Sequence, residues 1–217
     1  MNPAPLSSPA LFPERPAPLE EACAASPRDG AALLAFALSR RLEGDGRPVL
    51  MTATRAWLGE HGRPYGPGLP GTSLILAPVN TAAEALWTLE QALRSGAVSL
   101  ALGTVDAATL AQTRRLDFAA KHGGCVGLVL PRGLDGLSAA RRRWRISTLA
   151  SAVDPDDAKG PGAARLTAEL VRGRGERPGA WMLEQDDETH RLRLADRLAD
   201  SGLAAIGHAG APSGLAA

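Results

Sequence analysis

Hydrophobic positions along the chain alternate between short apolar runs and longer helical patterns. Apolar runs at residues 48–52, 73–77, 98–102 and 125–130 predict short buried strands. Apolar side chains at helical spacing predict helices from Asp29 to the break at residues 44–46, over 82–94 and over 107–121. Alternating strands and helices need crossover connections, which favour a mostly parallel sheet with helices against its faces.

The pattern changes towards the C-terminus. Residues 144–149, 165–171 and 180–184 read as strands joined by loops, which predicts an antiparallel C-terminal edge on the same sheet. Residues 59–71 hold five glycines and three prolines and predict a loop. We therefore expect an α/β fold with a flexible Pro-rich lead-in at residues 1–18, one domain at 19–194 and a C-terminal tail at 195–217.

Composition narrows the classes of function. A net charge of +1 provides no global attraction to nucleic acid or to an anionic membrane, so any basic surface must be local. Cys23 and Cys125 lack metal-ligand spacing, and we expect no disulfide, no bound metal and a reducing cytoplasmic location. The N-terminal residues lack the order of a signal peptide, and no apolar run approaches the length of a membrane span.

Several specific motifs point to a family. Residues 83–98 resemble the helix, the Arg-Ser-Gly-Ala-Val turn and the start of the Walker B strand in RecA-type recombinases. Trp87 in that helix, residues 114–124 in the next helix, Trp144-Arg145, and the hairpin at residues 169–181 resemble the ImuA branch of the RecA/SulA-like proteins. This resemblance covers about residues 19–194 and implies a RecA-like core for the predicted sheet.

The resemblance also implies a function. It suggests a cytoplasmic accessory of SOS mutagenesis that acts in error-prone translesion DNA synthesis. The implied partners are ImuB, an inactive homologue of Y-family polymerases, together with an error-prone replicative-type polymerase, RecA and single-stranded DNA. Proteins that share a fold often differ in function, so the function depends on the residues at the positions of the nucleotide site and of the DNA site.

The residues that match the nucleotide site do not suit ATP hydrolysis. The turn at residues 24–31 has no Gly-Lys-Ser/Thr motif, and it carries Pro27 and Asp29 where a phosphate-binding loop needs free N–H groups and no negative charge. No acid stands at residues 103–104 to support Mg²⁺; Asp106 follows, and a helix-capping role suits it better. Residues 52–56 offer no carboxylate to activate water. We predict no catalytic residues, no cofactor and no enzymatic activity.

Positive charge gathers late in the chain, where cationic and aromatic side chains are adjacent. Cations beside an aromatic ring are a combination that binds single-stranded nucleic acid. The candidate residues for binding DNA or a partner protein are Arg141, Arg142, Arg143, Trp144, Arg145, Arg172, Arg174 and Arg177. The alternative is structural: Trp144 enters the core, and the arginines of the hairpin contact only solvent.

Other interpretations stay open on the sequence alone. A SulA-like inhibitor of cell division and a diverged RecA-type ATPase are the rival functions. Trp87 is expected in the core, because Leu86, Leu89 and Leu93 define an apolar side of its helix. The alternative for Trp87 is a hot spot for a partner protein.

Overall fold

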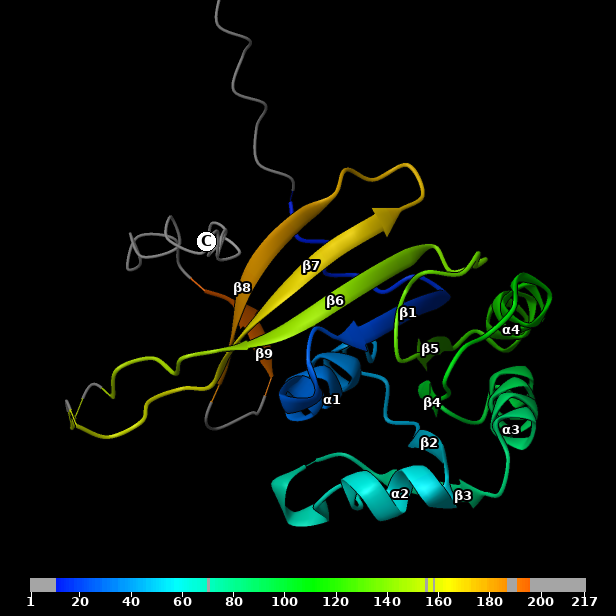
Figure 1. The fold of residues 1–217 in the computed structure, drawn as a ribbon, viewed down its shortest axis with the longest axis horizontal. Coiled ribbons are helices and arrows are strands. Elements are labelled where there is room, and N and C mark those ends of the chain that lie inside the picture. Colours follow the sequence, from blue (N-terminus) through cyan, green and yellow to red (C-terminus); the bar gives the residue numbers. More distant parts are fainter. Residues whose placement is uncertain (1–10, 70, 155, 158, 187–190, 196–217) are drawn as a thin grey trace, which may run out of the picture.

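The fold is seen in a computed structural model that describes residues 11–69, 71–154, 156–157, 159–186 and 191–195. Within these residues, nine strands form one mixed sheet in the order β3-β2-β4-β5-β1-β6-β7-β8-β9 (Figure 1). The strands are β1 (Leu19–Ala24), β2 (Val49–Thr54), β3 (Leu74–Val79), β4 (Leu100–Thr104), β5 (Val126–Leu130), β6 (Arg142–Leu149), β7 (Arg165–Gly173), β8 (Gly179–Gln185) and β9 (Leu192–Leu194). The helices are α1 (Gly30–Ser39), α2 (Arg55–His61), α3 (Ala82–Ser95) and α4 (Leu110–Gly123), with 3₁₀ turns η1 (Pro27–Asp29) and η2 (Gly66–Gly68).

The sheet has a parallel part and an antiparallel part. Strands β3, β2, β4, β5, β1 and β6 run parallel to their neighbours. Strands β6, β7, β8 and β9 then pair antiparallel, each with the next along the chain. This arrangement confirms the predicted fold class, a mostly parallel sheet flanked by helices with an antiparallel C-terminal edge.

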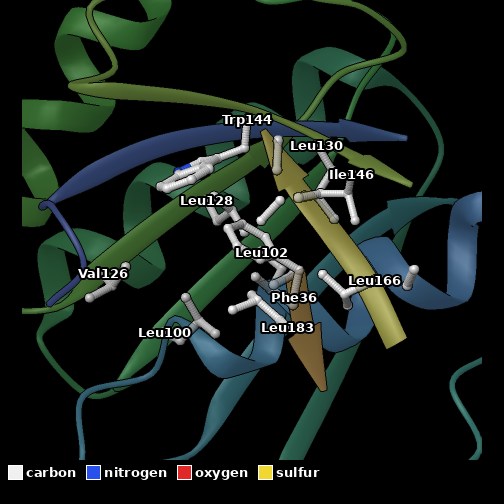
Figure 2. Packing of buried hydrophobic residues seen from close by; sticks show 14 of the residues in the cluster. Phe36, Leu100, Leu102, Val126, Leu128, Leu130, Trp144, Ile146, Leu166 and Leu183 are labelled. Atoms are coloured by element: carbon white, nitrogen blue, oxygen red, sulfur yellow. The ribbon is translucent and has the colours of Figure 1, made fainter. Parts of the chain in front are cut away.

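Helices cover both faces of the parallel part. Helix α1 packs on one face, where its Phe36 joins a core with residues of β2, β4, β5, β6, β7 and β8. Helices α3 and α4 lie side by side on the other face (Figure 1). Because β4 and β5 are covered on both faces, all their residues are buried and mostly apolar, as expected for central parallel strands. Figure 2 shows Trp144 and Ile146 of β6 packed into the first of these cores.

Local signals explain where α3 and α4 begin and end. The side chains of Thr81 and Thr109 accept hydrogen bonds from the backbone N–H groups of the first turns. Gly96 and Gly124 end the helices with positive φ angles of 66° and 59°, a conformation that glycine adopts without strain. None of the helices in the described residues is long and apolar enough to cross a membrane.

The hydrophobic pattern does not predict three of the elements. Strand β1 lies at the centre of the sheet, but its sequence carries Glu20 and Glu21 among apolar residues. Helix α2 begins after Thr54, whose side chain accepts from the N–H of Trp57 and caps the helix. Its last residues extend into the predicted loop at 59–71. The short β9 adds the last edge strand.

The predicted lead-in also differs in its described part. Residues 1–10 and most of the predicted tail at 195–217 lie outside the described residues. Residues 11–18, however, pack against the domain: the ring of Phe12 lies 5.9 Å from that of Trp144 and 5.6 Å from that of Trp181. Ala17 is buried. Phe12 is the apolar anchor that places this segment on the core, although prolines surround it in the sequence.

Candidate functional site

The structure divides the predicted basic site into an internal part and an exposed part. Arg142, Arg143 and Trp144 are buried in the sheet, whereas Arg141 and Arg145 are exposed. The burial of these three side chains fits the structural alternative, and binding of DNA or a partner by this segment stays a prediction. They are buried because β6 lies between β1 and β7: Arg142 and Trp144 point to one face of the sheet, and Arg143 points to the other, beside Glu21. Further along that second face, Arg145 is exposed.

A buried carboxylate, that of Glu20, accounts for the internal part. In the parallel register Glu20 stands opposite Arg142, and the two form an ion pair of 2.9 Å. The same carboxylate accepts from the guanidinium of Arg40 at 3.1 Å and from the indole N–H of Trp144 at 2.9 Å. The backbone N–H of Ala17 donates a further bond at 2.7 Å. A fully buried charge is tolerated because every side of it is hydrogen-bonded.

Arg40 carries the network into the N-terminal segment. Its guanidinium donates to the carbonyl oxygens of Pro13 and Glu14. It also lies between 5.6 and 5.7 Å from the ring centroids of Phe12, Phe36 and Trp144, within the range of cation–π attraction. The end of α1, strand β1 and the segment at 11–18 are thus joined by one side chain.

The next residues repeat the arrangement on the other face of the sheet. Arg143 Nε donates to the carboxylate of Glu21 at 2.7 Å, and Arg143 Nη1 donates to the carbonyl oxygen of Gly136. The hydroxyl of Ser138 donates to the other oxygen of Glu21. Two adjacent acids on β1 therefore meet two adjacent arginines on β6, one pair on each face.

The network also holds the β7–β8 hairpin. Arg142 makes a bidentate pair with Glu176 in the turn, with Nε–Oε2 at 2.7 Å and Nη2–Oε1 at 2.9 Å. The hydrogen bonds from Arg142 hold the pKa of the Glu176 carboxyl below its ordinary value. The turn is held from its backbone too, because the N–H of Arg174 donates to the carbonyl of Arg141.

The exposed part of the predicted site gathers at this hairpin. The side chains of Arg172, Arg174 and Arg177 are exposed and make no ion pair within the described residues. Arg141 lies at the same end of the sheet, with its Nε 3.8 Å from Glu176. We call Arg141, Arg172, Arg174 and Arg177 the arginine cluster. Arg145 does not join it, because it pairs with Glu169 further along the strands.

The turn that matches a phosphate-binding loop is occupied by a side chain of the chain itself. The buried carboxylate of Asp29 accepts from the N–H and the hydroxyl of Ser26 at 2.8 and 2.7 Å, and from the N–H of Thr148 at 2.8 Å. Burial raises the pKa of Asp29, but the hydrogen bonds from Thr148 and Ser26 outweigh it and lower the pKa below its ordinary value. In this turn the backbone N–H of Ser26 therefore donates to an internal carboxylate.

The other positions of the expected nucleotide site carry no magnesium-binding carboxylate in the described structure. Gly103 and Thr104 are buried in β4. Asp106 is exposed and pairs with Arg132 at 2.6 Å instead of capping a helix; Thr109 caps α4. Thr54, in the segment 52–56 that offers no carboxylate to activate water, caps α2. Within the described residues no group of three or more histidine, cysteine, aspartate or glutamate side chains is arranged to hold a metal ion.

The sequence and the fold are similar to those of known proteins. The chain matches no protein-family model. It is 37% identical to Protein ImuA of Caulobacter vibrioides, in two strains, and each match covers 74% of this chain and 70% of the relative. The chain belongs to the ImuA family. Among solved structures, SulA from Pseudomonas aeruginosa matches at 25% identity and a TM-score of 0.43, over 54% of this chain and 100% of that one. The predicted ImuA resemblance is confirmed.

Sequence reasoning missed the acids that organise this ImuA-family chain. Glu20, Glu21 and Glu176 decide which arginines are internal, and none of them was a candidate. The available signal was the pair of adjacent acids within the otherwise apolar segment 19–24, with a matching pair of adjacent arginines at 142–143. Two charges that enter a central strand require partners of opposite sign nearby.

Removing the buried acid tests the network. We expect Glu20→Ala to lower the free energy of unfolding by about 3–5 kcal/mol, because Arg40 then remains buried without a carboxylate and Arg142 keeps only that of Glu176. The matched control is Glu169→Ala, which breaks the exposed pair with Arg145 and should cost about 0.2–1 kcal/mol. Urea unfolding of both variants measures the difference. Equal midpoints for the two variants would show that the buried network contributes no more than a surface pair.

Proposed function

We propose that this chain is a non-enzymatic accessory of SOS-induced, error-prone translesion DNA synthesis. In this role it binds an ImuB-type inactive polymerase homologue through the arginine cluster, and it works beside an error-prone replicative-type polymerase. RecA and single-stranded DNA are further partners in the proposal. Membership of the ImuA family is the observation that carries it, and it supports a role in DNA damage-induced mutagenesis.

The residues of the phosphate turn support the non-enzymatic part of the proposal. Asp29 already accepts three hydrogen bonds there and keeps a negative charge where a nucleotide would bring its phosphates. Two anions at one turn repel each other, and the repulsion is strong where water is scarce. The absence of an acid at Gly103 and Thr104 also leaves no ligand for Mg²⁺ at that point of β4.

The arginine cluster supports the binding part. Within the described residues Arg172, Arg174 and Arg177 make no ion pair, so their guanidinium groups keep donors for carboxylates or phosphates, which they bind in a bidentate manner. Glu176 holds the hairpin in place through Arg142, so the cluster is presented on a rigid support. A preorganised cationic surface loses less conformational entropy when a partner binds.

ATP hydrolysis is the first test. We expect the purified chain to release no phosphate from ATP above the blank, with or without single-stranded DNA, since the turn holds its own carboxylate. Phosphate release measured over a series of protein concentrations checks this. The variant Asp29→Ala serves as a control for contaminating enzymes, whose activity it leaves unchanged. Release that rises with protein concentration and differs in Asp29→Ala would contradict the proposal.

Co-purification tests the proposed partner. The tagged full chain should recover the ImuB-type homologue of the same genome, and Arg174→Glu with Arg177→Glu should weaken recovery by about tenfold or more, because two attractive charges become repulsive. Arg55→Glu with Arg63→Glu is the matched control, since both residues are exposed and the charge change is the same. A cell-division protein is the second bait. Recovery of that bait alone would favour the rival inhibitor of division.

Binding of single-stranded DNA is tested separately by fluorescence anisotropy of a labelled oligothymidine. We expect modest affinity that falls as the salt concentration rises. In a plot of the logarithm of the binding constant against the logarithm of the salt concentration, the slope of the Arg174→Glu, Arg177→Glu variant should be shallower by about 0.7 for each phosphate contact that it loses. Arg142 and Arg143 are unsuitable for this test because their replacement disturbs the buried pairs. Equal salt slopes for the hairpin variant and the Arg55 and Arg63 control would exclude the hairpin as the DNA contact.

A further inference from the structure

A second surface lies on the opposite part of the molecule, between α3 and α4. A hollow of about 210 Å³ opens there. Its lining is Ala83, Leu86, Trp87, Glu90, Gln112, Arg115 and Leu116. The two helices touch at their C-terminal ends, where a Cβ on Gly123 would lie 1.9 Å from the carbonyl oxygen of Leu93. The hollow is therefore a fixed feature of a tightly packed pair, with room for one large apolar side chain.

Trp87 forms a wall of this hollow, contrary to the expectation that it lies in the core. Its side chain is 61% exposed, whereas Leu86, Leu89 and Leu93 are buried. The reason is helical geometry: Trp87 stands about 100° around the helix from Leu86, outside the buried stripe. Tryptophan is enriched at the centre of protein–protein interfaces, and there it packs in apolar pockets of the kind found beside Trp87.

At one end of the hollow, two exposed arginines share one carboxylate. Glu90 accepts from Arg94 at 2.8 Å and from Arg115 at 2.5 Å. One buried carboxylate is thus shared by two guanidinium groups, whose side chains are 58% and 65% exposed. Their remaining donors face solvent next to the hollow. The acid towards the start of α3, Glu84, accepts from the N–H of Asn80. The hollow is apolar inside and cationic at the end where Arg94 and Arg115 lie.

We propose that the α3–α4 hollow binds a short segment of a partner protein by one large apolar side chain flanked by a carboxylate. The apolar side chain enters between Trp87 and Leu116, and the carboxylate pairs with Arg115 and Arg94. This chemistry identifies the occupant as an acidic peptide with an aromatic or aliphatic anchor. A nucleic acid fits that combination less well, because its bases stack on the faces of exposed aromatic rings while its phosphates bring the negative charge, and it has no apolar side chain to place between two helices.

This inference goes beyond the proposed function and does not depend on the arginine cluster. The hollow lies on the α3–α4 side of the parallel strands, and the cluster lies at the hairpin of the antiparallel strands (Figure 1). One chain therefore has two separate surfaces for two contacts. Variants of one surface should leave binding at the other unchanged, so the failure of one proposal is distinguishable from the failure of the other.

The experiment uses the full chain with its tryptophan indole N–H groups labelled by ¹⁵N and observed by NMR. Trp87→Phe identifies the Trp87 resonance among the four tryptophans. The probes are three capped peptides: Asp-Phe-Asp, Lys-Phe-Lys and Asp-Ala-Asp. We expect Asp-Phe-Asp to shift the Trp87 resonance at about millimolar concentration and the other two to bind at least about tenfold more weakly. The indole signals of buried Trp144 and Trp181 should stay in place.

Matched variants complete the test. Arg115→Glu should weaken the binding of Asp-Phe-Asp by about tenfold. Phe118→Ala should leave it unchanged, because Phe118 is 77% exposed on α4 but does not line the hollow. No shift with Asp-Phe-Asp, or an equal shift with Lys-Phe-Lys, would overturn the proposal. A Trp87 resonance that moves with protein concentration alone would show that a second copy of the chain occupies the hollow, which also overturns it.

Discussion

The buried carboxylate of Glu20 is the constraint on which the rest of the structure depends. It lies in a central strand with no exposed surface, and it is surrounded by Arg40, Arg142, the indole of Trp144 and a backbone N–H. A charge in this position is costly unless each of its hydrogen-bonding sites is occupied. Its partners come from the end of α1, from β6 and from the segment before β1, so one group sets the relative positions of three parts of the chain.

The same constraint decides which arginines remain for binding. Arg142 is bound to Glu20 on one side and to Glu176 on the other, and this double contact links the core to the β7–β8 hairpin. The basic segment at 141–145 therefore divides its four arginines: Arg142 and Arg143 are buried, and Arg141 and Arg145 are exposed. The hairpin arginines add exposed positive charge next to Arg141, and the pair between Arg142 and Glu176 holds their turn in place.

The turn before α1 shows a related use of internal charge. The carboxylate of Asp29 accepts from the N–H of Ser26 in the turn and from the N–H of Thr148 in β6, and these bonds fix the turn against the sheet. The two surfaces for which contacts are proposed lie on different parts of the fold: the arginine cluster at the β7–β8 hairpin and the hollow between α3 and α4.

The sequence by itself determined the alternating strands and helices, the antiparallel C-terminal edge and the ImuA resemblance, because periodicity and local motifs report burial within a few residues. It did not reveal β1, whose two acids look unsuitable for a central strand, nor the exposure of Trp87, which depends on the packing of α3 against α4. Only the tertiary structure decided that Arg142 and Arg143 are internal while Arg172, Arg174 and Arg177 are exposed. The physical reason is that the acids which neutralise Arg142 and Arg143 lie 122 residues away in the chain and come close only when β1 and β6 pair.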